Sequence, residues 1–289
     1  MRELLAARGI QLTKSLGQNF LHDENQLRKI VEAAELTRAD KVLEIGPGLG
    51  PLTELLMENA GEVLAIEKDA RLVGILRERF EAGQAPRGSP SKSGKPERGA
   101  TPVLRLLHAD ALEFLRNEKN DWSNWKLASN LPYSVASRVL VELAGGPRAP
   151  KKIVATLQLE VARRLMARPG NDDYGVLTLL VQVDFEPRGF FKIPPGCFFP
   201  EPEVDSACVI LDRREQALLP ENLRAAFAKI VKRAFSQRRK MMLKLLKADW
   251  PREKLTRAFA ELKIPPRERA EKLSLEQFVE LVKTVNLIA

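Results

Sequence analysis

The stretch KVLEIGPGLG, residues 41–50, decides the fold. Its first five residues form a largely apolar run that stops at Gly46, which is the pattern of a buried strand entering a turn. Glycines at positions 46, 48 and 50 permit positive φ angles and let a ligand approach the backbone closely. Pro51 suits the first turn of a helix, so the sequence predicts a strand, a glycine-rich turn and a helix in succession.

Outward from this turn, strand patterns alternate with helix patterns along most of the chain. The predicted helices cover residues 23–35, 51–59, 70–80, 111–116 and 159–166, and the predicted strands cover residues 41–45, 62–67, 103–108, 125–129, 152–157, 177–185 and 207–212. The last two strands are expected to form a hairpin pair. Strands that alternate with helices predict an α/β fold with a parallel sheet that is covered on both faces.

The composition changes at two places, which suggests how the chain is organised. Beyond Arg213 it becomes helix-rich and basic, with breaks at Pro220, Pro251 and Pro265, so we predict an α/β domain over residues 1–213 and a small all-α domain over residues 214–289. Residues 82–102 hold four Pro, four Gly and three Ser, which predicts a disordered surface insertion. This insertion joins a helix to a strand, whereas ligands bind at the opposite edge of such sheets.

Composition also limits the class of protein. No apolar stretch is long enough to span a bilayer, and the N-terminus does not resemble a secretory leader. The two cysteines, Cys197 and Cys208, and the two histidines, His22 and His108, lack the spacing of metal ligands. We therefore expect a soluble cytoplasmic protein with no membrane contact and no metal, and a monomer is the default expectation.

Positive charge is concentrated in one segment. The chain carries a formal net charge of +9, and residues 223–248 contain nine basic residues and no acidic one. Such a run usually forms the solvated face of surface helices, but the complete absence of acids favours a nucleic-acid surface. The RNA contacts are predicted at Arg224, Lys232, Arg233, Arg238, Arg239 and Lys240.

Acidic residues follow the next two strands and suit an adenosine-containing cofactor. Glu67 ends the second strand, where a carboxylate can accept both hydroxyl protons of a ribose. Asp110 follows the third strand, and with the backbone N–H of Ala111 it could bind an adenine ring, although Asp110 could equally be a helix N-cap. The glycine spacing fits methyltransferases better than nicotinamide-binding turns, whose third glycine lies one residue later. Together these positions predict an adenosyl cofactor.

The tetrapeptide Asn130-Leu131-Pro132-Tyr133 follows the fourth strand and indicates the reaction. The N6 amine of adenine is a poor nucleophile because its lone pair is delocalised into the ring. The Asn130 side chain and a backbone carbonyl at Leu131 or Pro132 could bind the amine protons and localise that pair. Tyr133 offers a ring for base stacking. The alternative is an ordinary Asn/Pro turn.

A second aromatic motif precedes the last strand. Phe198, Phe199 and the prolines that follow form a stiff loop, and the Phe198 ring could close over the opposite face of the base. The competing interpretation is that these rings pack in the core.

Taken together, these motifs resemble the family of ribosomal RNA adenine N6,N6-dimethyltransferases that act on small-subunit rRNA. The resemblance covers nearly the whole chain and also includes residues 17–21, Tyr174-Gly175, residues 198–206 and residues 235–240. It implies a Rossmann-like S-adenosylmethionine-dependent methyltransferase domain with a small helical domain, and 16S-type rRNA of the small ribosomal subunit as the partner. It implies that S-adenosylmethionine is converted to S-adenosylhomocysteine while two adjacent adenosines near the 3′ end of that RNA are dimethylated.

The motifs and the resemblance together give the predicted site residues, and Gln18, Asn19 and Leu21 are implied by the resemblance alone. The cofactor-binding set is Gln18, Asn19, Leu21, Glu44, Gly46, Gly48, Glu67, Lys68, Asp110, Ala111 and Asn130. The catalytic set is Asn130, Leu131, Pro132, Tyr133 and Phe198. The chain departs from the family at Leu159, where lysine is frequent, at Ser137-Arg138, which replace a usually uncharged stretch, and in the insertion.

Two alternative functions stay open at this point. One is a related enzyme that dimethylates large-subunit rRNA and confers macrolide resistance, which would share the glycine turn and the Asn-x-Pro-Tyr motif. Residues 17–21 and 200–206 favour the small-subunit enzyme. The other is an RNA-binding assembly factor that has lost catalysis, and the intact Asn130 and Tyr133 argue against it.

Overall fold

The computed structural model describes residues 19–80, 102–118, 120–146 and 148–287. Its contacts divide the chain into two compact units. The α/β unit comprises residues 1–143, 150–159 and 188–212, and the helical unit comprises residues 144–149, 160–187 and 213–289. Gln18 and nearly all of the predicted insertion at 82–102 lie outside the described residues.

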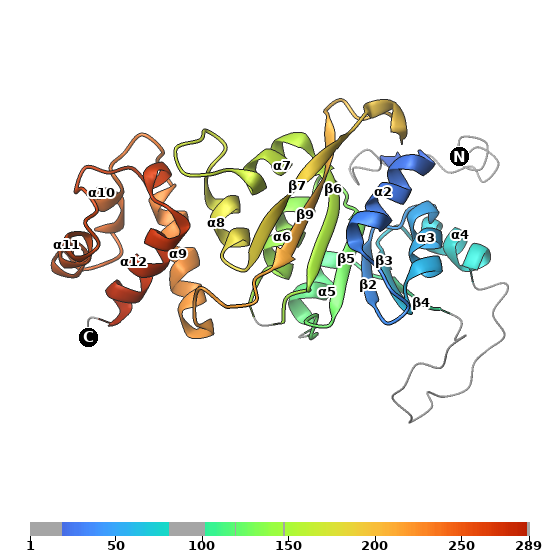
Figure 1. Cartoon of the computed structure of the whole chain (residues 1–289), viewed down its shortest axis with the longest axis horizontal. Coiled ribbons are helices and arrows are strands. Elements are labelled where there is room, and N and C mark those ends of the chain that lie inside the picture. Colours follow the sequence, from blue (N-terminus) through green and yellow to red (C-terminus); the bar gives the residue numbers. More distant parts are fainter. Residues whose placement is uncertain (1–18, 81–101, 119, 147, 288–289) are drawn as a thin grey trace, which may run out of the picture. The chain divides into compact units, whose positions relative to one another are not determined.

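A seven-stranded sheet forms the centre of the α/β unit, with the strand order β4-β3-β2-β5-β6-β9-β7 (Figure 1). The strands are β2 (Lys41–Ile45), β3 (Glu62–Glu67), β4 (Val103–His108), β5 (Trp125–Asn130), β6 (Lys152–Gln158), β7 (Phe185–Ile193) and β9 (Ser206–Arg213). Strands β2 to β6 pair in parallel, and β9 pairs antiparallel with β6. The predicted parallel sheet is therefore confirmed, and the carboxyl ends of β2 to β5 meet at one edge.

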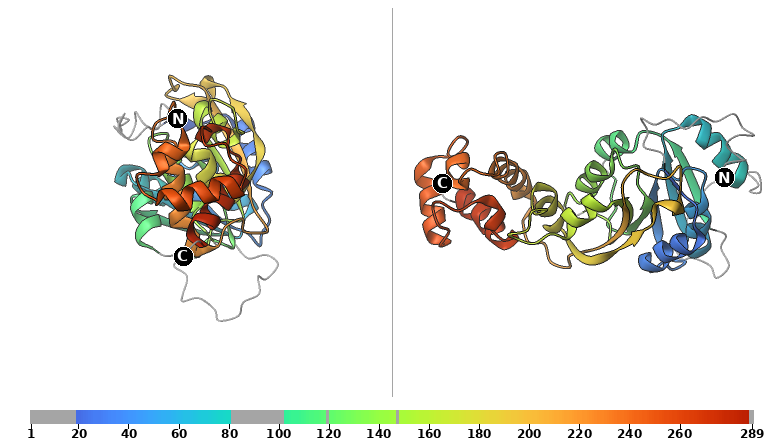
Figure 2. Two further views of the ribbon diagram at one scale, coloured as in Figure 1. Left: turned by 90° about the vertical axis from the view of Figure 1, so that its left-hand side faces the viewer. Right: turned by 90° about the horizontal axis from the view of Figure 1, so that it is seen from above.

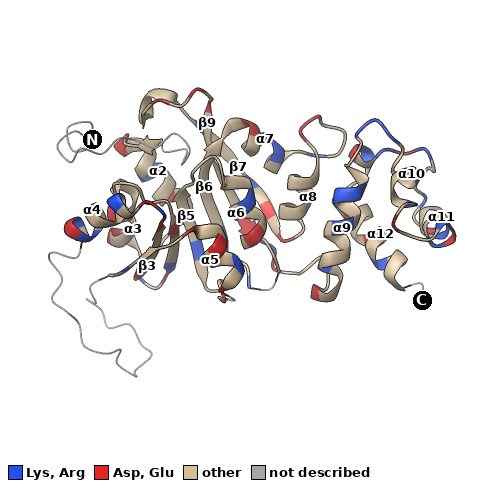
Figure 3. Cartoon of the chain, turned by 180° about the vertical axis from the view of Figure 1, so that it is seen from behind, with Lys and Arg blue, Asp and Glu red and all other residues tan. Residues whose placement is uncertain are grey.

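Helices cover both faces of this sheet, as expected for parallel strands. They are α2 (Glu24–Ala34), α3 (Pro51–Asn59), α4 (Ala70–Phe80), α5 (Ala111–Asn117) and α6 (Ala136–Leu143). Figures 1 and 3, which view the chain from opposite sides, show α2 and α3 on one face and α5 and α6 on the other. The right-hand view of Figure 2 shows the strands between these layers. Fully buried side chains of β2, β5 and β6, such as Val42, Ala128 and Val154, form part of the core.

A small second sheet pairs a strand that precedes β2 with one that follows β7. Strand β1 (Phe20–Leu21) pairs antiparallel with β8 (Phe198–Phe199), which follows the short 3-10 helix η2 (Pro195–Cys197). The Phe199–Pro200 peptide bond is cis. This pairing brings the segment before the first helix of the α/β unit next to the aromatic loop, although the two are far apart in the sequence.

The strand predicted at residues 177–185 is wrong. Residues Val176–Gln182 form helix α8, and the strand β7 begins only at Phe185. A short apolar run cannot be assigned to strand or helix by periodicity alone. Here Thr178 donates a hydrogen bond to the Arg164 carbonyl at 2.6 Å and accepts one from the Gly175 N–H at 3.2 Å, which stabilises the helix start. The neighbouring position of β7 and β9 in the sheet agrees with the expected strand pair, at a shifted position. Helix α6 was not predicted.

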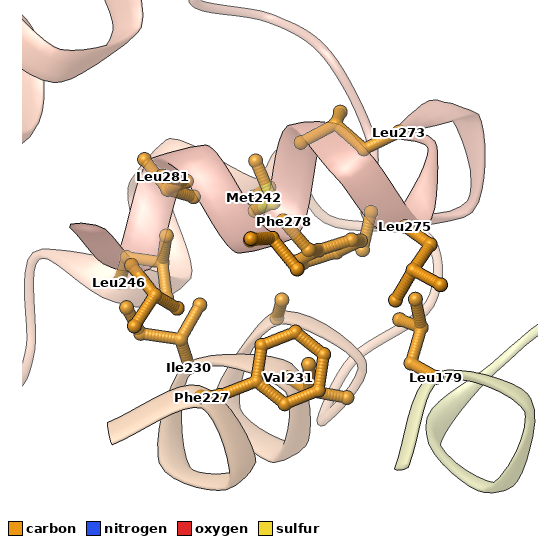
Figure 4. Packing of buried hydrophobic residues seen from close by; sticks show 14 of the residues in the cluster. Leu179, Phe227, Ile230, Val231, Met242, Leu246, Leu273, Leu275, Phe278 and Leu281 are labelled. Carbon is orange, nitrogen blue, oxygen red and sulfur yellow. The ribbon is translucent and has the colours of Figure 1, made fainter. Parts of the chain in front are cut away.

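The helical unit has its own apolar core. Its elements are α7 (Leu159–Met166), α8, η3 (Glu221–Leu223), α9 (Arg224–Ala234), α10 (Met242–Leu246), α11 (Arg252–Glu261), η4 (Ala270–Lys272) and α12 (Leu275–Leu287). Phe227 and Ile230 of α9 face Phe278 of α12 and Leu246 of α10 (Figure 4). Within the described residues, no helix combines the length and the apolar character that a membrane span requires.

Residues 160–187 belong to this helical core, although the sequence assigns them to the first domain. Leu179 of α8 and Tyr174 are buried in the same cluster as α9 and α12. The Tyr174 hydroxyl donates a hydrogen bond to the Leu273 carbonyl at 2.9 Å. Packing of an apolar helix face groups these residues with the C-terminal helices, and the boundary at 213/214 stays a prediction.

Candidate active site

A cavity of about 340 Å³ opens at the edge where β2, β3, β4 and β5 end. Eleven of the predicted site residues line it: Asn19, Gly46, Gly48, Glu67, Lys68, Asp110, Ala111, Asn130, Leu131, Pro132 and Tyr133. The structure thus gathers at one place residues that are separated by up to 114 positions, from 19 to 133. This is the edge where parallel α/β sheets bind ligands.

The glycine-rich turn is shaped by close packing as well as by backbone conformation. Gly46 and Gly48 have φ angles of +72° and +63°. A Cβ atom at Gly48 would lie 2.6 Å from the Phe20 ring, and one at Gly46 would lie 3.0 Å from Pro132 Cγ. The turn therefore contacts β1 on one side and, on the other, the loop of residues 130–133, here called the acceptor loop. Any side chain at either glycine position would disturb the cavity wall.

Glu67 is held at the end of β3 by backbone donors. Its side chain accepts hydrogen bonds from the Gly48 N–H at 3.2 Å and the Asp69 N–H at 2.9 Å. The residue is only 6% exposed, and burial raises the pKa of its carboxyl while these backbone donors oppose that rise. A carboxylate in this position can accept hydroxyl protons from a ligand in the cavity.

Asp110 has two roles in the geometry. Its Oδ1 accepts hydrogen bonds from the N–H groups of Leu112 at 2.8 Å and Glu113 at 3.2 Å. Asp110 is therefore the N-cap of α5, the role that the sequence offered as an alternative to adenine binding. Its Oδ2 accepts from Lys68 Nζ at 2.8 Å inside the cavity wall. The Lys68 ammonium is the main reason that the pKa of Asp110 lies below its usual range. The carboxylate stays ionised and oriented toward the cavity.

Asn130 lines the cavity and has an unused hydrogen-bond acceptor. Its Nδ2 donates to the Asn19 carbonyl at 2.9 Å, and this bond sets the orientation of the amide. Its Oδ1 is buried and has no hydrogen-bond partner among the described residues. A buried carbonyl oxygen without a donor is costly, so this atom is suited to accept a proton from a ligand group.

The next three residues complete the acceptor loop. The Leu131 N–H donates to the Thr156 carbonyl at 3.1 Å, which ties the loop to β6. The Pro132 carbonyl accepts from the N–H groups of Val135 at 3.0 Å and Ala136 at 3.1 Å, where α6 begins. The Tyr133 hydroxyl is hydrogen-bonded to the buried Ser206 hydroxyl. Burial raises the pKa of Tyr133 despite that bond, so the phenol is protonated at neutral pH.

Of the predicted cofactor-binding and catalytic residues that the structure describes, three do not line the cavity. Leu21 and Phe198 face each other across the β1–β8 pair and are each 2% exposed in the apolar core, so for Phe198 the core interpretation describes its position. Glu44 is 1% exposed and accepts from the Thr53 hydroxyl at 2.7 Å. Burial raises the pKa of Glu44 to about 8. Neighbouring Ile45 lines the cavity instead, because successive strand side chains point to opposite faces.

The cavity also includes residues that the sequence reasoning did not assign. They are Phe20, Ile45, Ile66, Leu72, Ala109, Leu112, Ser134, Val135 and Arg138. Strand alternation could have indicated Ile45 and Ile66, and the short distance along the chain from Tyr133 could have indicated Ser134 and Val135. The described part of the chain contains no cluster of His, Cys, Asp and Glu placed to hold a metal ion.

The six predicted RNA-binding cations fall into two groups of three in the helical unit, where Figure 3 shows Lys and Arg along α9 and the segment that follows. Arg224 pairs with Asp184, Arg233 pairs with Asp249 at 2.9 Å, and Arg238 pairs with Glu271 at 3.0 Å and Asp172 at 3.1 Å. Lys232, Arg239 and Lys240 are exposed and form no ion pair among the described residues. Only the second group leaves its charge uncompensated.

A parallel sheet with a glycine-rich turn, a strand-end carboxylate and an oriented Asn carbonyl around one cavity defines a Rossmann-like methyltransferase. A family model described as ribosomal RNA adenine dimethylase matches residues 9–287. The chain belongs to this family and is an S-adenosylmethionine-dependent rRNA adenine dimethyltransferase.

Individual relatives agree with that assignment. The chain is 37% identical to a ribosomal RNA small subunit methyltransferase A of Clostridium perfringens over 287 residues, which cover 99% of this chain and 94% of the relative. It is 36% identical to the protein of the same name from a Geobacillus species, with 97% and 94% covered. Among solved structures it is similar to the 23S rRNA methyltransferase ErmE, with a TM-score of 0.65, 27% identity and coverage of 93% and 100%. A dimethyladenosine transferase from Plasmodium falciparum shares the fold, with a TM-score of 0.73, 24% identity and coverage of 93% and 98%.

Proposed function

We propose that this chain dimethylates the N6 amines of two adjacent adenosines near the 3′ end of small-subunit rRNA, in the cytoplasm and as part of ribosome biogenesis. Relatives named as small-subunit methyltransferases match almost the full length of the chain. Within the site, one observation carries the proposal: Asn130 lines the cavity, and its Oδ1 is buried with no hydrogen-bond donor among the described residues.

The residues present fit S-adenosylmethionine. Gly46 and Gly48 leave room for close approach along the turn, and the Glu67 carboxylate is placed to accept the ribose hydroxyls. Asp110 and the following backbone are placed to bind the adenine, with Lys68 keeping the Asp110 carboxylate ionised. Bound S-adenosylmethionine supplies a methyl group activated by a positively charged sulfur.

Asn130 and its neighbours would prepare the target amine. The Asn130 Oδ1 would accept a hydrogen bond from one N–H of the amine, and a backbone carbonyl would accept one from the other, so that the nitrogen lone pair is directed toward the methyl group. The bonds that Pro132 carbonyl already makes to α6 favour the Leu131 carbonyl as this second acceptor. Tyr133, held by Ser206, would stack on the extruded base. Each methyl transfer makes the nitrogen cationic until it releases one proton to solvent. The singly methylated amine then has one N–H and its lone pair, so the same groups serve the second transfer.

Outside the cavity, RNA is bound through phosphates. We assign the contacts of the helical unit to Lys232, Arg239 and Lys240, because their charges are exposed and not compensated by carboxylates. Arg224, Arg233 and Arg238 are retained as weaker candidates, since their ion pairs would have to be exchanged for phosphate. We expect the protein to act as a monomer.

The large-subunit enzyme is the second candidate, because ErmE has the same fold at 27% identity. The small-subunit relatives are more similar in sequence, at 37% identity. An assembly factor without catalysis is the third candidate, and the oriented Asn130 amide argues against it.

The test supplies undermethylated small subunits and large-subunit precursors separately, with labelled S-adenosylmethionine, and identifies the modified nucleoside by mass. Wild type is expected to form dimethyladenosine in small subunits only. Asn130→Ala should lower turnover by roughly 10²–10³-fold, as when a preorganised electrostatic contact is removed. Asn59→Ala is the matched control, because that amide contacts the Leu55 carbonyl within α3 and lies outside the cavity. Transfer to large subunits, or cofactor binding without any transfer, would select the second or third candidate.

A further inference from the structure

Arg138 lies at the rim of the cavity, on the side of the acceptor loop. It is in the first turn of α6, and it lines the cavity together with Tyr133, Ser134 and Val135. Its guanidinium reaches back over the loop, where Nη2 donates to the Ser134 carbonyl at 3.1 Å. The residue is exposed, so its charge lies at the mouth of the cavity, whereas the Asn130 amide is inside.

The charge of Arg138 is not compensated. Four charged residues line the cavity, namely Glu67, Lys68, Asp110 and Arg138. Lys68 and Asp110 form an ion pair with each other, and Glu67 is held by backbone N–H groups. Among the described residues, Arg138 alone of this set contacts only a neutral carbonyl. A guanidinium has five N–H donors, so most of them remain available to an anion.

From this arrangement we infer that Arg138 binds a phosphate that flanks the target adenosine and so positions the nucleotide in the cavity. The inference rests on the proposed function. A base inserted beside Asn130 leaves its ribose and both flanking phosphates at the mouth of the cavity. Arginine matches a phosphate in a bidentate geometry, and the bond to Ser134 restricts the side chain before RNA binds. Arg138 therefore acts on the RNA backbone, while Asn130 acts on the base.

A carboxylate is the other anion that could reach this guanidinium, since S-adenosylmethionine carries one. Arg138 lies in the helix that follows Tyr133 and Ser134, the end of the cavity lining that the proposed function assigns to the target base, and this favours the RNA phosphate. The two anions predict different effects of removing Arg138. Loss of a phosphate contact weakens only RNA binding, whereas loss of a carboxylate contact weakens only cofactor binding.

The experiment compares wild type, Arg138→Ala and Arg138→Lys, with small subunits as substrate. Two quantities are measured: kcat/KM for the subunits at several salt concentrations, and the Kd of S-adenosylmethionine in the absence of RNA. Arg138→Ala should lower kcat/KM by about tenfold, mainly through KM, which corresponds to one lost hydrogen bond to a charged group. Its slope of log kcat/KM against log salt should be smaller by about one. Arg138→Lys should keep that slope, because the charge is retained, but it should recover only part of the activity, because lysine cannot make the bidentate contact.

Arg77→Ala is the matched control. Arg77 is an exposed arginine of α4 outside the cavity, so its removal changes the net charge equally but should alter neither quantity. An unchanged KM and salt slope in Arg138→Ala would overturn the inference. So would a weaker Kd for S-adenosylmethionine with unchanged salt dependence, because it would assign Arg138 to the cofactor carboxylate. Absence of methyl transfer by wild type would instead refute the proposed function, and this inference with it.

Discussion

The cavity edge of the α/β unit and the basic segment of the helical unit are both rich in polar groups, but they are built in opposite ways. At the cavity, Glu67, Asp110 and Asn130 are each oriented by hydrogen bonds to backbone groups. In residues 223–248 the charges lie on α9, on α10 and on the segments beside these helices, and half of the predicted RNA contacts already form ion pairs. Function at the cavity therefore depends on the direction of single side chains, and function in the basic segment depends on how much charge is left over.

The largest effect is expected in the apolar core of the α/β unit, at Phe198. Phe198→Ala should lower the free energy of unfolding by roughly 3–5 kcal/mol, because it opens a hole in the core. Phe198→Leu should cost less and leave KM for RNA unchanged. Denaturant unfolding and steady-state kinetics test both variants. If Phe198→Ala had normal stability and a raised KM for RNA, the hypothesis that Phe198 stacks on the target base would be favoured over its role in the core.

Glu44 should make stability depend on pH. Burial raises its pKa to about 8 in the folded protein, whereas in the unfolded chain it titrates near 4.5. Since the folded state holds the proton longer, the stabilisation is full below the unfolded pKa and is lost as pH rises toward 8. Glu44→Gln should remove this loss while keeping the Thr53 hydrogen bond, so its advantage in Tm over wild type should grow between pH 5 and pH 8. A difference in Tm that does not vary with pH would contradict the buried position of this carboxyl.

The glycine turn tests how tightly the cavity wall is built. Gly48→Ala adds a Cβ 2.6 Å from the Phe20 ring at a positive φ angle, so binding of S-adenosylmethionine should weaken by at least about tenfold. Gly74→Ala is the control, because a Cβ at that position in α4 meets nothing within 4 Å. It should leave binding unchanged and stabilise α4 slightly. Isothermal titration of both variants decides, and equal affinities would show that the turn tolerates a side chain.

The smallest single effects are expected in the basic segment, where they should add up. Replacing Lys232, Arg239 and Lys240 together by Ala should weaken RNA binding and lower the salt slope by up to about three, with little change in stability. Arg224→Ala should lower stability and change RNA binding little, because it leaves the largely buried Asp184 without its ion pair. Filter binding at several salt concentrations and thermal unfolding separate the two. Equal RNA losses in both sets would remove the distinction between paired and unpaired cations.

Much of the α/β unit follows from local pattern. The bounds of β2, β3, β4, α3 and α4 agree with the predicted ranges, because these segments carry strong periodicity and clear end signals such as Gly46 and Pro51. The strand predicted at 177–185 failed for the opposite reason. Its apolar run is short, and packing in the helical core decides its conformation.

The sequence by itself determined which residue types stand at the carboxyl ends of the strands, and thereby the class of cofactor and the chemistry of the acceptor. Only the tertiary structure decided which face each side chain takes. In the folded protein the side chains of Glu44 and Phe198 are buried in the core. The Asn130 amide is oriented by the carbonyl of Asn19, which is distant in the sequence, and Arg138 lies at the rim of the cavity. The physical reason is that composition and spacing act along the chain, whereas orientation is set by partners that meet only on folding.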